Sequence, residues 1–461
     1  MAAAELYRPP APKPTSPVRA LLNVAWQGDR DLLTLLPAQA YRAEVSPLGR
    51  SRRGILLVNA PEQIAPILAN PQEHFPKNDL MVGALEGLVG NSIFVSDGAA
   101  WRRQRRMIEP AFSHMRINQA FSSMAAAVDD CVSRWDELAR SGELFSLDAA
   151  MSFLTADIIC RTIFSRSLDT GIGADVFHAF TDFEKSVASV ELTRLLLGKP
   201  FAKVVQPPKV RAACKLIRDH FNTMLDQRLE EGADAGDDIA GAIIAARDPD
   251  TGEPFSREEL IDQIGVFFLA GHETTASVLT WTFFIVSQQP SVVARMRHEI
   301  EQVAGPGEIT FEHTKKLAFT RNVFRETLRL YPPITFIPRV AAEATTIAGR
   351  KVKRGTMIMI APWTIHRNQA YWPAADRFDP DRFSADREGE VKPGTYIPFG
   401  LGPRICVGAA FATVEASLIL ARLVRRYDLE ALDPERVRPV ARLTTRPARE
   451  IMCRVRPLPA V

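Results

Sequence analysis

The sequence predicts a mainly α-helical chain with small β-sheets that folds as one large domain. Helical periodicity recurs along most of the 461 residues, whereas segments with strand character are few and short. Length alone would favour about three domains. Proline and glycine are spread along the chain, however, and no low-complexity block or repeat divides it, so a single domain is the better prediction.

The first half of the chain is predicted to contain one strand, one short helix and then a run of helices. Residues 54–59 (GILLVN) have the composition of a strand, and residues 61–68 that of a short helix. Six further segments show the helical spacing of apolar residues: 99–114, 116–140, 146–165, 174–190, 208–231 and 237–247.

The second half contains the longest predicted helix, residues 258–288. Pro290 lies just beyond its end, as is common where helices stop. The other elements predicted here are a helix over 320–330 that stops at Pro332, strands over 346–348 and 357–363, and a helix that begins near residue 408.

Composition and charge narrow the kind of protein. With 57 basic and 54 acidic residues the net charge is only +3, so nothing points to a nucleic-acid partner. The five cysteines show no paired spacing, which favours a reducing compartment without disulfides. We therefore expect a cytoplasmic protein.

No segment of the chain has the character of a membrane anchor. Residues 1–30 are predicted to form a proline-rich arm, extended or disordered, and residues 31–461 the single folded domain. A long apolar stretch over 264–286 is interrupted at its centre by polar residues 272–275. It therefore predicts a buried core helix rather than a membrane span.

Cys406 lies in the glycine-rich segment 399–408 (FGLGPRICVG). A thiolate here can be the axial ligand of a haem iron, which favours O–O cleavage. The glycines before it permit tight turns, and the helix start after it favours an anionic sulfur. Gly408 has no side chain to keep that helix away from a flat macrocycle, and Arg404 can reach a haem carboxylate. A buried free cysteine in a loop is the alternative.

This segment resembles the haem-binding signature of the cytochrome P450 family, F-x-x-G-x-R-x-C-x-G. The match falls at Phe399, Gly402, Arg404, Cys406 and Gly408. The resemblance implies that haem b, iron protoporphyrin IX, is buried between the long central helix and the loop that carries Cys406. Three more motifs in the family's order extend it over residues 90–410.

The second motif is residues 270–275 (AGHETT), in the middle of the longest helix. Gly271 is understandable if the backbone opens there or lies against something flat. The alternative is a polar notch in a core helix. By the resemblance, Ala270 faces the haem, Thr274 steadies bound oxygen and Glu273 gates proton delivery. His272 is assigned no role.

The third motif is E-x-x-R, with Glu326 and Arg329 on one helix face. An ordinary surface pair is the alternative. By the resemblance, the two residues form a structural triad with Arg382 on the cysteine side of the haem. Asp381 stands where the family usually has glutamate, a mild departure that leaves the chemistry unchanged.

The fourth motif is W-x-x-x-R, with Trp101 and Arg105 on one helix face. Indole and guanidinium N–H groups suit a haem propionate, and by the resemblance Arg339 supplies another propionate arginine. Arg102 and Arg106 form a second stripe that could receive an acidic redox partner. A solvated basic face is the alternative for that stripe.

The resemblance implies a haem-thiolate monooxygenase that inserts one oxygen atom from O2 into a hydrophobic small molecule, by hydroxylation or epoxidation. Because the chain contains no second cysteine cluster and no recognisable flavin segment, electrons are expected from a separate ferredoxin or flavodoxin-type donor with its reductase. Three rivals remain: a peroxide-using haem-thiolate enzyme or isomerase, a haem-based ligand sensor, and a carrier of apolar ligands without haem.

Substrate-facing positions follow from placement within the family pattern. They are mostly apolar, which predicts a hydrophobic substrate, although each could be plain core. They lie in the loop 81–89, on the long helix, just after Pro332 and near the C-terminus. The residues are Leu85, Val89, Val266, Phe267, Ile334, Ile337 and Thr444. Residues 177–210 are predicted to form a mobile lid that bends at Gly198 and Pro200.

Overall fold

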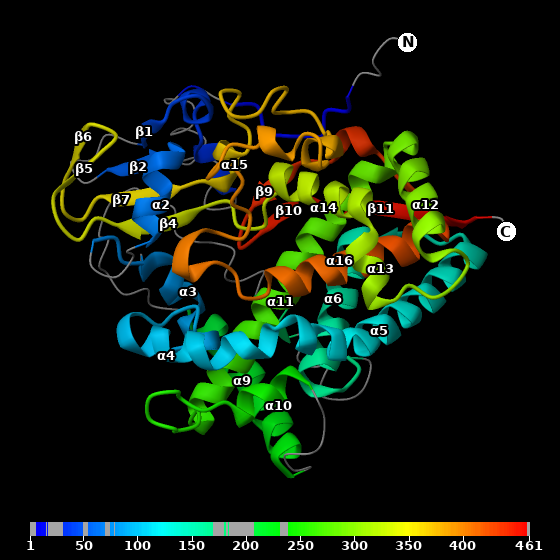
Figure 1. The fold of residues 1–461 in the computed structure, drawn as a ribbon, viewed down its shortest axis with the longest axis horizontal. Helices are drawn as coiled ribbons and strands as arrows, with labels where there is room; N and C mark the ends of the chain where they lie inside the picture. The colour runs from blue at the N-terminus through cyan, green and yellow to red at the C-terminus, as the bar shows by residue number, and fades with distance from the viewer. Residues whose placement is uncertain are drawn as a thin grey trace.

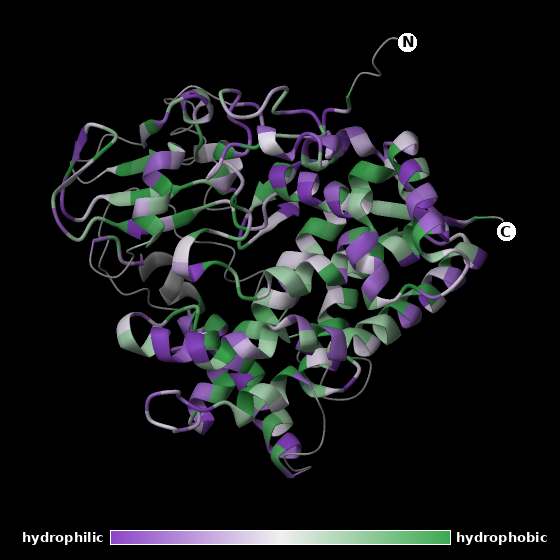
Figure 2. Cartoon of the chain, viewed as in Figure 1, coloured by the Kyte–Doolittle hydropathy of each residue, from purple (hydrophilic) through white to green (hydrophobic). Residues whose placement is uncertain are grey.

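The computed structural model of the chain describes residues 6–14, 16, 31–48, 54–69, 74–77, 79–168, 179–180, 183, 207–230 and 238–458. Helices form most of it, and a four-stranded sheet lies to one side (Figure 1). Figure 2 shows hydrophobic residues concentrated in the inner helices and strands, with hydrophilic stretches on the outer ones. The predicted fold class is confirmed.

One long central helix, α11 at Arg257–Ser287, organises the described helices. The others are α2 (Pro61–Ala69), α3 (Asp79–Val89), α4 (Gly98–Ile108), α5 (His114–Ser141), α6 (Leu147–Phe164), α9 (Pro208–Glu230), α10 (Ile239–Ala245), α12 (Pro290–Ala304), α13 (Phe311–Lys316), α14 (Ala318–Leu330), α15 (Pro362–Ile365) and α16 (Ala409–Val424). Short 3-10 helices occupy Leu32–Leu35, Ala38–Tyr41, Glu109–Phe112, Pro380–Phe383, Glu388–Glu390, Gly402–Arg404 and Pro434–Arg436.

The largest sheet has the strand order β1-β2-β7-β4, with bounds Val45–Leu48, Ile55–Val58, Met357–Ile360 and Ile337–Val340. β2 and β7 are parallel, and the two edge strands are antiparallel to them. The central strands are unbroken apolar runs because both of their faces are buried. Pro47 and Pro338 lie in the edge strands, where a residue without an N–H is tolerated.

Three smaller sheets complete the described strands. The first has the order β3-β11-β8, at Phe145–Ser146, Met452–Pro457 and Tyr427–Ala431. β5 (Thr345–Ile347) pairs with β6 (Arg350–Val352). β9 (Pro439–Ala441) and β10 (Thr445–Pro447) form an antiparallel hairpin, which packs against the middle of α11.

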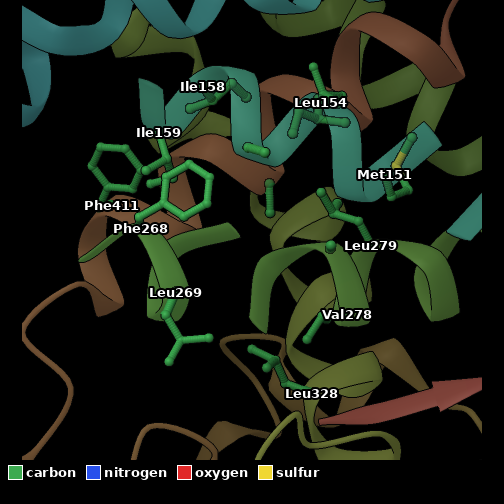
Figure 3. Packing of buried hydrophobic residues seen from close by; sticks show 14 of the residues in the cluster. Met151, Leu154, Ile158, Ile159, Phe268, Leu269, Val278, Leu279, Leu328 and Phe411 are labelled. Atoms are coloured by element: carbon green, nitrogen blue, oxygen red, sulfur yellow. The ribbon is translucent and has the colours of Figure 1, made fainter. Parts of the chain in front are cut away.

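α11 begins with a capping box and is buried along most of its length. The Ser256 hydroxyl accepts from the backbone N–H of Glu259 at 3.2 Å, and the Glu259 carboxylate accepts from that of Ser256 at 2.8 Å. Figure 3 shows side chains of α6, among them Ile158 and Ile159, packed near Phe268 of α11. Within the described residues, no helix combines the length and apolarity needed to cross a membrane.

Gly271 lies where α6 and α11 approach each other closely. A Cβ added at this position would lie 2.4 Å from Cδ1 of Ile159. The α-helix continues through residue 271 without a break, so the glycine serves helix–helix packing. An opening of the backbone, one of the two explanations considered for this glycine, is not observed.

Two sequence-based assignments were wrong, and one helix was missed. Residues 81–89, predicted as a loop, lie in helix α3. The strand predicted over 357–363 ends at Ile360, because Pro362 takes the first position of α15, where its fixed φ suits a helix start. Pro290 likewise begins α12, a helix that the sequence analysis did not include. Of the predicted lid, only residues 179, 180, 183 and 207–210 are described, so Gly198 and Pro200 lie outside the described residues.

The proline-rich arm is docked onto the domain over residues 7–10. The backbone N–H of Phe378 donates to the carbonyl of Tyr7 at 2.9 Å. Arg8 pairs with Asp376 at 2.7 Å, and the Tyr331 hydroxyl donates to the carbonyl of Pro10 at 2.5 Å. This part of the arm is extended, and it is held by residues more than 300 positions away in the sequence.

Candidate active site

Cys406 is the only exposed cysteine of the five; the other four are buried. Its loop turns at Gly400 and Gly402, both with φ of +79°, a conformation that favours glycine. The Cys406 backbone N–H donates to the Phe399 carbonyl at 2.9 Å, which closes the turn. A Cβ on Gly408 would lie 3.9 Å from the sulfur, so the start of α16 is close to Cys406, as predicted.

Cys406 is exposed at one side, but protein atoms lie close around its sulfur. Burial raises the pKa of this thiol, and the backbone of Gly408 and the charge of Arg105 act in the opposite direction. The protein alone therefore does not favour the thiolate. A bound metal cation would supply the charge that the anionic form requires.

Cations gather where the propionates of a haem were expected. Arg339 and Arg404 lie near Lys77, and Asp97 is the carboxylate that binds Arg404. Burial, together with the charge of Arg404, lowers the pKa of Lys77 to about 7. Burial and Arg404 likewise lower the pKa of Arg339 to about 10. Three cations with one carboxylate fit a ligand that brings negative charge.

The hydrogen bonds of this cluster are also incomplete. The Nε atoms of Arg339 and Arg404 are buried and have no hydrogen-bond partner among the described residues. The Arg404 guanidinium lies 4.2 Å from the centre of the Trp101 ring, which keeps it in place. Buried donors without partners are rare, so this cluster is suited to the two carboxylates of a haem. Lys77 was missed because it lies in no motif.

Arg105 and Arg106 make contacts that the sequence did not indicate. Arg105 donates to the carbonyl of Ile405 at 2.8 Å and pairs with Glu109 at 3.3 Å, so it braces the Cys406 loop. Arg106 binds the carboxylate of Asp250. The basic stripe predicted to attract a redox partner is therefore partly neutralised within the chain.

The E-x-x-R pair is fully buried, and a third residue, Arg382, joins it. Arg329 donates to both oxygens of Glu326 at 2.7 Å, and Arg382 donates to one of them at 3.3 Å. The remaining N–H groups of Arg329 bind the carbonyls of His366, Ala375 and residue 377, which satisfies all five of its donors.

The triad is connected to the Cys406 loop through His366. Nε2 of this buried ring accepts from the backbone N–H of Ile397 at 2.9 Å. Burial, with the nearby charge of Arg329, lowers the pKa of His366 to about 3, so it stays neutral and remains an acceptor. Asp381 stands where the family usually has glutamate. Its carboxylate accepts two hydrogen bonds from Arg295 on α12.

One face of α11 is open where the rest of the helix is buried. From Leu260 to Val286, only Ala270, Gly271 and Thr274 are not buried. Residues three and four apart share a helix face, so these positions form one patch. The Thr274 hydroxyl donates to the Ala270 carbonyl at 2.7 Å. The patch is where the sequence placed the face toward the haem.

Glu273 points away from that patch into a polar cluster. Its carboxylate accepts from both Nε and a terminal nitrogen of Arg446, the first at 3.0 Å, and from the Thr444 hydroxyl at 2.5 Å. Thr444, predicted to face substrate, is thus buried against Glu273. Arg446 escaped the sequence analysis because its partner lies 173 residues away.

His272 is a core residue. Its ring packs between those of Phe180 and Phe268, with centres 4.8 and 4.9 Å away. Burial lowers its pKa to about 4, so it is neutral near pH 7. Four predicted substrate positions are also buried in the core: Leu85, Val89, Val266 and Phe267. Ile334 and Ile337 are half-buried.

Glu415 is a buried acid that sequence reasoning missed. It lies on α16 with no exposed surface. Burial raises its pKa to about 8, and the nearby hydroxyl of Thr275 opposes this only in part. The folded chain therefore holds this carboxyl in its protonated form at neutral pH.

Replacing Glu415 with glutamine is expected to change how stability depends on pH. Between pH 4.5, the ordinary pKa, and about pH 8, the folded chain binds a proton that the unfolded chain has lost. The free energy of unfolding must therefore fall as pH rises through this window, by at most about 1.4 kcal/mol per pH unit. Glu415→Gln removes that loss, which denaturant unfolding at pH 5 and pH 8 would measure.

The matched control for this prediction is Glu430→Gln, an exposed glutamate on β8. It should leave the pH dependence of unfolding as it is in the unmodified chain. If the free energy of unfolding changed equally with pH in the unmodified chain and in Glu415→Gln, that result would contradict a neutral Glu415.

Comparison with known proteins gives a consistent result. The family model described as cytochrome P450 matches residues 12–454. A cyclooctat-9-en-7-ol 5-monooxygenase of Streptomyces melanosporofaciens is 33% identical over 88% of this chain and 86% of its own. A pentalenene oxygenase of Streptomyces avermitilis is 27% identical over 94% of each chain. Among solved structures, a cytochrome P450DA heme domain has a TM-score of 0.83 at 24% identity and covers 98% of both chains.

Proposed function

This chain belongs to the cytochrome P450 family of monooxygenases, and from that premise we propose that it inserts one oxygen atom of O2 into a hydrophobic small molecule. The single observation that carries the proposal is the exposed Cys406, between the glycine turns and the start of α16. In this proposal residues 31–461 are the catalytic domain, and residues 1–30 are an arm docked on it.

The residues present fit a haem, which we propose to be haem b. Cys406 would bind the iron, and the open face of α11 at Ala270 would lie on the opposite side of the ring. The Phe399 carbonyl holds the backbone of Cys406 and Gly408 lies close to the sulfur, while Trp101, Arg339, Arg404 and Lys77 would hold the propionates. When bound, the haem supplies the activation of O2.

The chain's own contribution is to hold and move protons beside that face. The Thr274 hydroxyl, half-buried on the open patch, donates to the Ala270 carbonyl and is placed to accept a hydrogen bond from a small molecule above Ala270. Glu273, one residue before it, is the acid that would bring protons in from the polar cluster. Both roles are proposed from the family motif and from the positions of these two side chains.

The substrate is proposed to be an unsaturated hydrocarbon skeleton. The predicted substrate positions Val266, Phe267, Ile334 and Ile337 are apolar and carry no charge that would select a polar ligand. The names of two relatives, a cyclooctat-9-en-7-ol monooxygenase and a pentalenene oxygenase, refer to such compounds.

Electrons are proposed to come from a separate ferredoxin or flavodoxin-type protein with its reductase. Next to Cys406, Ile405 is 43% exposed, and Arg102 is exposed on the neighbouring helix α4. An apolar contact flanked by basic charge suits a small acidic partner.

The proposed function is tested by isotope labelling with cyclic alkenes. The purified chain, a redox partner and NADPH are incubated under labelled O2, and products are analysed by mass spectrometry. We expect one labelled oxygen atom in the product. Product that forms only when peroxide is added, without oxygen from labelled O2, would favour a peroxide-using enzyme. Absence of haem from the purified chain would favour an apolar-ligand carrier.

Thr274→Val is expected to separate electron use from product formation. The isosteric side chain lacks the hydroxyl, so NADPH consumption should continue while product per NADPH falls roughly tenfold or more. Product and peroxide are measured against NADPH consumed. Thr282→Val is the matched control, because Thr282 makes the same bond to the carbonyl four residues earlier, at 2.8 Å, away from the open face. Peroxide-driven turnover unaffected by Thr274→Val, with unchanged NADPH coupling, would contradict the role.

A further inference from the structure

Arg446 connects two carboxylates that belong to two different helices. From β10, one edge of its guanidinium binds both oxygens of Glu273 on α11. Its other terminal nitrogen donates to Asp148 on α6 at 2.8 Å and to the Ser152 hydroxyl at 3.2 Å. The side chains of Glu273 and Arg446 are only 5% and 11% exposed, so their pairing takes place largely out of water.

The cluster carries one cation and two carboxylates. Arg446 is positive, and Glu273 and Asp148 are negative when ionised, which leaves a net charge of one minus. Among the described residues beside Glu273, Thr444 donates a hydrogen bond from its hydroxyl and His272 is neutral near pH 7, so neither adds a charge. One proton added to Glu273 would leave a neutral pair of Arg446 and Asp148.

The strand that carries Arg446 is fixed firmly against α11. The carbonyl of Thr445 accepts from the Ser277 hydroxyl at 2.7 Å and from the Trp281 indole at 2.8 Å. The Thr445 hydroxyl donates to the Pro332 carbonyl at 2.6 Å. The backbone that carries the guanidinium is therefore held in place relative to Glu273. A cation held in this way can control the direction in which the Glu273 carboxylate points.

We propose that Arg446 is a positioning residue that holds charged Glu273 away from Thr274 and releases it when Glu273 takes up a proton. Both oxygens of Glu273 face Arg446, whereas Thr274 lies about 100° around the helix. The inference rests on the proposed function, in which Glu273 delivers protons, and it adds the element that sets when Glu273 is available.

Asp148 is what makes the release possible. If Glu273 were the only counter-charge, its protonation would leave a buried guanidinium unpaired, which is unfavourable. Asp148 lies in the first turn of α6 and is 29% exposed, so it remains in contact with water while it pairs with Arg446. Arg446 thus always retains one carboxylate, whichever state Glu273 is in.

The test is an infrared titration of Glu273 in the purified resting protein, without turnover. The band of the protonated carboxyl is assigned by its loss in Glu273→Gln. Arg446→Gln removes the cation and is expected to raise the midpoint of this band by about 1–3 pH units. Asp148→Asn removes the competing carboxylate and is expected to lower the midpoint. If Arg446 had a merely structural role, Arg446→Gln and Asp148→Asn would not shift the midpoint in opposite directions.

Controls and alternatives keep the test decisive. Arg456→Gln and Asp428→Asn make the same charge changes at exposed positions and should leave the midpoint in place. Arg446→Lys keeps the charge and is expected to stay close to the unmodified midpoint, so it and Asp148→Asn suffice if Arg446→Gln does not fold. Shifts of the same sign, or no shift, would overturn the proposal. Failure of the labelling experiment with these shifts intact would instead refute the proposed function.

Discussion

Cys406→Ser is expected to yield a folded chain that neither shows the carbon monoxide spectrum of a thiolate-bound haem nor forms an oxygenated product. Serine fits the same turn, because the backbone bond from residue 406 to Phe399 and the glycines at 400 and 402 are unaffected. An alcohol, however, does not ionise near neutral pH and does not donate electron density to iron as a thiolate does. Spectra after reduction, and product analysis, measure both losses.

The control for Cys406→Ser is Cys214→Ser, a change of the same kind on α9. Cys214 is buried, and burial raises its pKa to about 11, so it is not expected to bind a metal. This variant should keep the spectrum and the activity. A Cys406→Ser protein with an unchanged spectrum and full product formation would refute the assignment of the ligand, because another side chain would then have to hold the iron.

Glu326→Gln is expected to lower the free energy of unfolding by about 3–5 kcal/mol. The carboxylate is fully buried between Arg329 and Arg382, which are 0% and 5% exposed. Glutamine occupies the same space, but it removes the carboxylate paired with Arg329 and one of the two carboxylates that act on Arg382. Because the triad also holds His366, which binds the Cys406 loop, the variant should retain less haem. Denaturant unfolding and haem content are the measurements.

The chain offers a close control in Glu312→Gln. Glu312 pairs with Lys315 at the same spacing of three residues, but both side chains are exposed, at 66% and 48%. Its loss should change the free energy of unfolding by less than about 1 kcal/mol. Equal effects of the two substitutions would contradict the view that burial gives the Glu326 pair its importance.

The parts of the site that sequence reasoning predicted depend on short-range spacing. Glu326 and Arg329 are one helical turn apart, and the turn before Cys406 follows from its glycines. Local geometry fixes such groups almost independently of the rest of the fold. Their motifs were therefore enough to predict the Glu326–Arg329 pair and the turn before Cys406, whereas Arg382, 56 positions from Glu326, was assigned only by the family resemblance.

The parts that were missed depend on contacts between distant segments. Arg446 meets Asp148 across 298 positions, and Lys77 meets Arg339 through a bridge between loop and strand. Neither contact has a spacing that a sequence pattern could reveal. Arg105 illustrates the same limit, because the helix face was predicted but not that Ile405 would lie against it.

The pairing of β2 with β7 has a consequence for the synthesis of the protein on the ribosome. Val58 lies opposite Ile360, so the strand ILLV has no neighbour on that side until some three hundred further residues have been made. At synthesis rates of about 5–20 residues per second, that wait is roughly 15–60 s. During this interval β2 is an apolar segment without its partner, and it is the part of the nascent chain that a chaperone should protect first.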